Sequence, residues 1–363
     1  MWKWKTDWQW RLEIVPKASK QLSEFVQRVK REPFEHALDE PVAMWTETEI
    51  LDGEEVKAAV AIIRTRGCYW SIKEGCTMCG YFNDTVPGGV ATEFLEQQWI
   101  EIIEHFSNYK YVKIYTSGSF LDPTEIPKDF ANMIMTDLVN YGVEKVLVES
   151  LPEFVHKRHM QYDKSPDIEV AIGLESATPI VLDKCVNKRL TEKGFKRACK
   201  AVHEIGGTVK AYILLKPPYL NEGHSIEDTV YSAKFAAPYV DKISINPVNI
   251  QKNTVGERMW RNREWRPPWL WSVVEVIEQC EKIGTRVYSD PTGGGTQRGA
   301  HNCGKCDSEI LEKLKNNRIS GVKIDKPKCR CRELWKNLIE QAKYRRDGSE
   351  PEGYRRGFVG VKR

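Results

Sequence analysis

Residues 58–84, AAVAIIRTRGCYWSIKEGCTMCGYFND, run from an apolar stretch of strand character into a loop with three cysteines, Cys68, Cys76 and Cys79. Three thiolates on one loop can hold three irons of a cubane iron–sulfur cluster, which leaves the fourth iron open to another ligand. The alternative is a structural zinc site that borrows its fourth ligand from elsewhere. The loop therefore predicts a [4Fe-4S] cluster with one open iron, directly after a first strand.

Strand-length apolar runs alternate with helix-length amphipathic segments along the chain. The expected strands are Val56–Thr65, Tyr111–Tyr115, Lys145–Val148, Glu169–Gly173, Val209–Leu215 and Lys242–Ile245, with Arg286–Ser289 as a short extension of one edge. The expected helices are Thr92–Ser107, Ile126–Asn140, Pro152–Gln161, Thr191–Ile205, Ser225–Tyr239 and Leu270–Ile283. Such alternation implies parallel strands joined by right-handed crossovers. Because six strand–helix units are fewer than the eight of a closed barrel, we expect an α/β fold, a partial TIM-like (β/α)6 barrel.

The barrel is expected to span residues 55–285, between a tryptophan-rich basic N-terminal extension (1–54) and a cysteine-rich C-terminal extension (286–363). With 41% hydrophobic and 29% charged residues, the chain can bury a core and remain soluble. No apolar run approaches the length of a membrane span, and the N-terminus MWKWKTDWQWRLE lacks the apolar region of a secretory signal. We therefore expect a cytoplasmic protein whose cysteines stay reduced.

Polar residues follow the predicted strands at their carboxyl ends, the edge where ligands gather in parallel α/β folds. The second strand precedes the turn Ser117-Gly118-Ser119, in which a glycine lets a ligand approach the backbone closely. Glu149 and Glu175 follow the third and fourth strands and can accept hydrogen bonds from an amine or from ribose hydroxyls, with helix capping as the alternative. Candidates to hold a substrate, again with capping as the alternative, are Lys216, Tyr219, Asn246 and Asn249.

A second cysteine group lies near the C-terminus, in HNCGKCD and CRC. Its four thiols match the closed tetrahedral shell of a structural zinc ion, which would attach the C-terminal segment to the barrel. Four thiolates also suit an auxiliary iron–sulfur cluster. The spacing leaves both metals open, and we favour zinc. The ligands in either case are Cys303, Cys306, Cys329 and Cys331.

Basic and aromatic residues interleave in ERMWRNREWRPPWLW, residues 257–271. Arginines beside aromatic rings suit phosphate contact and base stacking, so this block and the basic tail at residues 343–363 are candidates to bind RNA. In the alternative interpretation, the tryptophans fill a core and the arginines only face water. The candidate RNA-binding arginines are Arg258, Arg261, Arg263 and Arg266.

The cysteine loop, the SGS turn and the segment IGLES (residues 172–176) together resemble the radical S-adenosylmethionine (SAM) superfamily. The C-x7-C-x2-C spacing is similar to the subgroup that contains the Elongator catalytic subunit and oxygen-independent coproporphyrinogen oxidase. The resemblance implies that the open iron binds the amino and carboxylate groups of SAM, whose cleavage yields a 5′-deoxyadenosyl radical. Met78 stands where the superfamily often has an aromatic residue, and Tyr81 is expected to pack against the cofactor instead.

The same resemblance implies further SAM contacts. The turn that matches Ser117, Gly118 and Ser119 meets the amino group of SAM, and a basic residue that matches Lys188 in VNKRLT meets its carboxylate. The remaining implied SAM contacts are Glu149 and Glu175.

Over nearly the whole chain, the motifs RTRGCYWSIKEGCTMCGYFND, GLES, VNKRLT and GAHNCGKCD resemble the RaSEA family, the archaeal radical SAM enzymes of archaeosine formation. This implies a tRNA substrate whose position-15 7-deazaguanine carries lysine through its side-chain nitrogen. It also implies a partner subunit that transfers this lysine and an external electron donor. The implied reaction is radical cleavage of the lysine C–N bond. The alternatives are a radical methylthiotransferase, an Elongator-like enzyme and a non-catalytic zinc protein that binds RNA.

Overall fold

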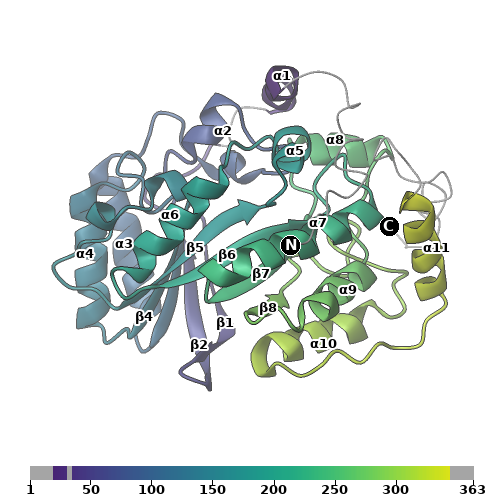
Figure 1. Ribbon diagram of the computed structural model, residues 1–363. Coiled ribbons are helices and arrows are strands. Elements are labelled where there is room, and N and C mark those ends of the chain that lie inside the picture. The colour runs from purple at the N-terminus through teal and green to yellow at the C-terminus, as the bar shows by residue number, and fades with distance from the viewer. Residues whose placement is uncertain (1–18, 31–34, 344–363) are drawn as a thin grey trace.

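Eight strands form one sheet in the computed structural model, which describes residues 19–30 and 35–343. The strands follow one another across the sheet in chain order and curl into a half-barrel (Figure 1). β1 is antiparallel to β2, and every later neighbour is parallel. The predicted partial barrel is thereby confirmed. The strands are β1 (Ala43–Leu51), β2 (Glu54–Ile62), β3 (Tyr111–Tyr115), β4 (Lys145–Ser150), β5 (Asp167–Glu175), β6 (Thr208–Leu215), β7 (Lys242–Pro247) and β8 (Arg286–Ser289).

The edge strand β1 is an element that the predicted strand set lacks. It pairs with β2 along its whole length, from Ala43 opposite Ile62 to Leu51 opposite Glu54. The two strands are joined by Asp52-Gly53, with φ angles of 51° and 87°. Two consecutive left-handed residues form the hairpin turn that favours Asp-Gly. This dipeptide is therefore a sequence signal from which the hairpin can be predicted.

Helices cover the outer face of the sheet (Figure 1). Because side chains alternate along a strand, this face carries a row of apolar residues with 0% exposure, namely Ile114, Val148, Ile172, Ile213 and Ile245. No helix in the described ranges is both long and apolar enough to cross a membrane. The helices are α1 (Ser19–Val29), α2 (Tyr69–Lys73), α3 (Thr92–Phe106), α4 (Lys128–Asn140), α5 (Pro179–Val181), α6 (Glu192–His203), α7 (Glu222–Ala236), α8 (Val255–Arg261), α9 (Leu270–Cys280), α10 (Asp307–Ser320) and α11 (Cys331–Lys343).

The helix predicted over Pro152–Gln161 is wrong. The segment contains two single 3₁₀ turns, Pro152–Phe154 and Lys157–His159, with extended backbone at Val155 between them. Its apolar residues lack the three-to-four-residue spacing of an amphipathic helix. Val155 and Met160 nevertheless pack into the core, with 0% and 4% of their surface exposed. An irregular crossover thus joins β4 to β5.

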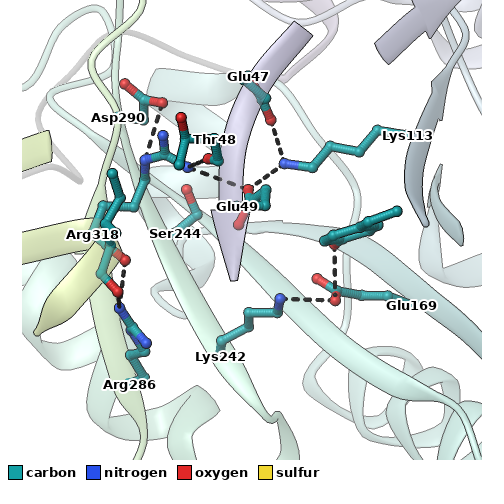
Figure 2. A network of polar contacts seen from close by, with 12 residues as sticks. Glu47, Thr48, Glu49, Lys113, Glu169, Lys242, Ser244, Arg286, Asp290 and Arg318 are labelled. Atoms are coloured by element: carbon teal, nitrogen blue, oxygen red, sulfur yellow. Dashed lines mark hydrogen bonds and ion pairs between the residues drawn. The ribbon is translucent and has the colours of Figure 1, made fainter. Parts of the chain in front are cut away.

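Charged side chains line the inner, concave face of the sheet (Figure 2). Lys113 of β3 forms ion pairs with Glu47 and Glu49 of β1. Glu169 of β5 lies 2.8 Å from the ammonium of Lys242 on β7. Burial raises the pKa of Glu49, but the neighbouring lysines, above all Lys113, outweigh this and lower it to about 2. These charges of the inner face are therefore held as ion pairs between strands.

Arg318 of α10 bridges the two edges of the half-barrel (Figure 2). Its Nη1 donates to Thr48 O at 2.9 Å and lies 3.3 Å from Glu49 Oε1. Its Nε lies 3.3 Å from Asp290 Oδ2, in the residue directly after β8. The Arg318 side chain is only 8% exposed. One buried guanidinium thus joins the first strand to the end of the last.

Arg318→Met is expected to lower the free energy of unfolding by about 2–4 kcal/mol, because it removes one partner from a buried ionic network. Chemical denaturation followed by circular dichroism measures this change. Lys313→Met, on the same helix, is the control, since Lys313 pairs with the exposed Glu309. A loss in the control as large as that for Arg318 would contradict the bridging role.

Candidate metal and cofactor site

The cysteine loop follows β2 at the carboxyl edge of the parallel strands. Gly67 (φ 79°) and Gly75 (φ 80°) take left-handed backbone on either side of α2, a conformation that glycine adopts without steric cost. Cys68 precedes α2, and Cys76 and Cys79 follow it. All three are free, half-buried thiols. The chain therefore has the predicted order of a strand and then three cysteines.

The three thiols influence one another. Burial raises the pKa of Cys76, and the charges of Cys79 and Cys68 raise it further. Burial likewise raises the pKa of Cys79 to about 11. Among the described residues, only the C-terminal cysteine group has three or more ligand atoms within 4.8 Å of one another. The wider spacing of Cys68, Cys76 and Cys79 suits three irons that each take one thiolate, rather than one shared ion.

The helix α1 covers the cysteine loop, a contact that sequence reasoning missed (Figure 1). Gln27 Nε2 donates to Ser71 O at 3.2 Å, and Lys30 Nζ donates to Ser71 Oγ at 2.8 Å. Burial lowers the pKa of Lys30, whereas the three cysteines raise it. A positive charge therefore lies beside the thiols. No local motif marks this contact, because Lys30 and Ser71 are 41 positions apart.

The turn Ser117-Gly118-Ser119 packs directly on the cysteine loop. A Cβ on Gly118 would lie 2.7 Å from the backbone N and Cα of Cys68, so the approach requires glycine. Glu125 fixes the turn, since its carboxylate accepts hydrogen bonds from Ser119 N and from Thr65 Oγ1, both at 2.6 Å. Burial raises the pKa of Glu125 to about 7. Sequence reasoning missed Glu125, which belongs to no motif.

Lys188 returns to the end of β5 and meets Glu175 there. Its Nζ lies 2.9 Å from Glu175 Oε1 and 2.9 Å from Gly173 O. The left-handed backbone of Asn187 (φ 63°) turns the chain at this point. The Asn187 side chain donates to Gly75 O at 2.7 Å. The structure therefore brings the predicted residues Glu175 and Lys188 together and attaches them to the cysteine loop.

Glu149 lies near the end of β4, on the inner face of the sheet. Burial raises its pKa to about 7, although a hydrogen bond from Tyr212 lowers it. Tyr212 also forms a hydrogen bond with Tyr115. All three side chains are half-buried despite their place on central strands, because no helix layer within residues 19–30 and 35–343 covers the inner face as it does the outer. The ring of Tyr81, which follows Cys79 closely, is 55% exposed and available to a ligand.

The four predicted substrate-holding residues separate into two groups. Lys216 Nζ lies 2.8 Å from Glu222 Oε2, and both side chains are at most 1% exposed, so Lys216 forms a structural ion pair. The other three remain half-buried at the carboxyl edge: Tyr219, Asn246 and Asn249.

The four C-terminal cysteines converge on one point. The sulfur atoms of Cys303 and Cys329 are 3.6 Å apart, as are those of Cys306 and Cys331. The sulfur atoms of Cys329 and Cys331 are 3.4 Å apart. Thiolates around one tetrahedral zinc, with bonds of about 2.3 Å, would stand about 3.8 Å from one another. Thiolates of a cubane bind separate irons and stand farther apart. The group can therefore hold one metal ion.

The arginine–tryptophan block divides between core and surface. Its buried aromatic residues are Trp265, Trp269 and Trp271, each at most 5% exposed. Arg266 is also buried, and its Nη2 donates to His301 O at 2.6 Å. The exposed arginines of the block are Arg258, Arg261 and Arg263. The basic tail over residues 344–363 lies outside the described residues.

Gly118→Ala is expected to leave the chain folded but nearly free of iron, because the added methyl group would displace the backbone of Cys68. Metal analysis after anaerobic reconstitution tests this, with about four irons per chain expected for the wild type. Gly88→Ala is the control, since nothing lies within 4 Å of a methyl group added there. Full iron content in the Gly118 variant would contradict the role of this contact.

Comparison with known proteins places the chain in a family. No protein-family model matches it. It is 36% identical over 334 residues to the archaeosine synthase subunit beta of Methanosarcina acetivorans, with 89% of this chain and 96% of that protein covered. It is 35% identical over 311 residues to the archaeosine synthase subunit beta of Thermococcus kodakarensis, with 82% and 96% covered. Among solved structures, it is similar to a queuine lyase from Clostridium spiroforme bound to SAM and queuine, with a TM-score of 0.47 and 15% identity over 68% of this chain and 95% of that one. The two curated relatives confirm the resemblance, and the chain belongs to the archaeosine synthase subunit beta family.

Proposed function

We propose that this chain is the radical SAM lyase of archaeosine formation. It cleaves the bond between the lysine side-chain carbon and the side-chain nitrogen, so that this nitrogen stays on the position-15 7-deazaguanine of tRNA as part of the amidine of archaeosine. One observation carries the proposal. The cysteine loop, the Gly118 turn and the Glu175–Lys188 pair meet at one edge of the half-barrel. The names of the relatives support a tRNA-modifying enzyme of this kind.

In this proposal, the site gives each part of the cofactor a partner. Cys68, Cys76 and Cys79 would hold three irons of a [4Fe-4S] cluster, and the cluster together with SAM would supply the radical chemistry for hydrogen abstraction. The protein's task is to hold the lysine methylene beside that radical and to exclude water. The half-barrel suits this task, because charged and tyrosine side chains lie on its inner face and helices cover its outer face (Figure 1).

The predicted SAM contacts keep their roles in the proposal. The ammonium of Lys188 meets the carboxylate of SAM, and the turn Ser117-Gly118-Ser119 meets its amino group. Glu149 also faces that amino group, and a neighbouring ammonium would lower the raised pKa of Glu149 and keep it ionised. The two remaining contacts are Glu175 with ribose hydroxyls and Tyr81 with adenine.

Zinc is the metal that we propose for the four C-terminal cysteines. Their sulfur separations of 3.4 and 3.6 Å are close to the edge of one tetrahedral shell and too short for four irons. Trp271 Nε1 donates to Cys331 Sγ at 3.2 Å, which connects the site to α9. The ion would therefore attach α10 and α11 to the barrel, and through α10 it would support Arg318.

The exposed arginines of the block are proposed to contact the tRNA backbone. They lie on and after α8, whose Gly256 N donates to Thr77 O of the cysteine loop at 3.1 Å. Arg258, Arg261 and Arg263 therefore stand beside the edge where the reaction takes place. The proposed protein partners are the subunit that attaches lysine to the tRNA and an external electron donor.

Cys76→Ala is expected to abolish the release of 5′-deoxyadenosine from SAM under dithionite, because the cluster loses one of its three thiolates. Chromatography of the nucleoside measures this. Cys280→Ala is the control, since Cys280 is a buried residue of α9 that packs in the core. Undiminished release by the Cys76 variant would contradict the cluster assignment. A wild-type chain with zinc but no iron would favour the non-catalytic RNA-binding alternative.

Replacement of Arg258, Arg261 and Arg263 by glutamine is expected to weaken tRNA binding and to reduce the slope of log K against log salt by about 2 to 3. Binding titrations at several salt concentrations measure both effects. A matched control replaces Lys193, Lys196 and Lys200 of α6 by glutamine, because they form a basic group on another part of the surface. The same slope change in both triple variants would show that Arg258, Arg261 and Arg263 do not form a specific contact with tRNA.

A further inference from the structure

The inner face of the half-barrel carries several lysines, and most of them have a carboxylate partner. Lys113 pairs with Glu47 and Glu49. Glu169 accepts two lysines, with Lys145 at 3.2 Å and Lys242 at 2.8 Å. At the carboxyl edge, Lys188 pairs with Glu175 at 2.9 Å.

Lys210 of β6 is the exception among these described lysines. Its side chain is 6% exposed. Its ammonium lies 5.2 Å from the ring centroid of Tyr212 and 5.6 Å from that of Tyr288. Within the described residues it has neither a hydrogen bond nor an ion pair. Aromatic rings offset only part of the desolvation cost of burying a cation. This ammonium can therefore gain stability by binding an anion.

The strand register places a small residue beside Lys210. Lys210 stands opposite Ala171 of β5, and Ala171 stands opposite Glu149 of β4. Ala171 thus stands between Lys210 and Glu149 along one row of the inner face. The charge of Lys210 lowers the pKa of Glu149, and it likewise lowers those of Glu49 and Glu169. The ammonium thus lies in the field of three carboxylates but forms an ion pair with none of them.

We infer that Lys210 binds the α-carboxylate of the lysine moiety on the tRNA, an assignment that rests on the proposed function. Lysine attached through its side-chain nitrogen keeps a free α-carboxylate. This carboxylate must enter the half-barrel when the side chain reaches the cofactor. In a weakly solvated interior it needs a cation. Lys188 is already assigned to the carboxylate of SAM, and the remaining inner-face lysines, Lys113, Lys145 and Lys242, form ion pairs with strand carboxylates. The row of Tyr212, Lys210 and Tyr288 therefore forms a subsite for a carboxylate.

This subsite gives the enzyme a means to select its substrate. A nucleobase adduct that lacks the carboxylate would leave the Lys210 ammonium buried and unpaired in the complex. A site built around a charged group discriminates strongly against an analogue without that group. Lys210 is thus a specificity residue that acts on the amino-acid end of the adduct, away from the bond that breaks.

A cycle of two enzymes and two substrates tests the inference. The enzymes are the wild type and Lys210→Met. The substrates are synthetic RNA hairpins that carry either the lysine adduct or the 1,5-diaminopentane adduct, which lacks only the carboxylate. Lys210→Met should lower kcat/KM on the lysine adduct at least about 30-fold and on the diaminopentane adduct by at most about threefold. Lys210→Arg should recover part of the loss, because it restores the charge.

Two outcomes overturn the inference. Equal losses on both substrates would mean that Lys210 does not contact the carboxylate. No loss on either substrate would mean the same. Iron content and 5′-deoxyadenosine release without RNA confirm that each variant is folded and loaded. If the wild type converts neither hairpin, the proposed function itself fails, and this assignment fails with it.

Discussion

Most of the charge on the concave face of the sheet is neutralised by ion pairs within the protein, and this constraint shapes the molecule. The outer face is sealed by helices over residues such as Ile114 and Ile213, so the polar positions of the same strands face inward. A buried charge is costly unless it is paired. β1 supplies Glu49 to this network, and α10 supplies Arg318. The edge strand β1 and the C-terminal helix α10 therefore supply ion-pair partners for charges on the inner face of the barrel.

The carboxyl edge of the same strands concentrates the chemistry. Parallel register brings the ends of β2 to β7 to one side, and three local devices then bring the loops into contact. The missing Cβ of Gly118 lets a turn reach Cys68. The left-handed Asn187 returns Lys188 to β5. The N-terminus of α8 is held against the cysteine loop by a backbone hydrogen bond to Thr77. Each of these contacts is formed by one or two residues. Together they bring groups from distant parts of the chain to the carboxyl edge of the sheet.

The parts of this arrangement that could be predicted from sequence are those with local signals. Apolar periodicity predicted the seven strands from β2 to β8, and cysteine spacing predicted both cysteine groups. The Asp52-Gly53 turn was an equally local signal that was overlooked. Other features depend on distant partners. Lys30 reaches Ser71, and Arg318 reaches Thr48 across 270 positions. No spacing rule links such residues. The burial of Arg266 and Lys216 is likewise decided by packing, which residue type alone does not reveal.

The central claim is that this chain uses SAM to break the lysine C–N bond on tRNA. Its most direct test is anaerobic incubation with SAM, dithionite and tRNA whose attached lysine is deuterated along the side chain. Mass spectrometry then follows both the modified nucleoside and 5′-deoxyadenosine. The account predicts that archaeosine forms and that deuterium appears in 5′-deoxyadenosine. A nucleoside that keeps its lysine, or 5′-deoxyadenosine that forms without deuterium, would contradict it.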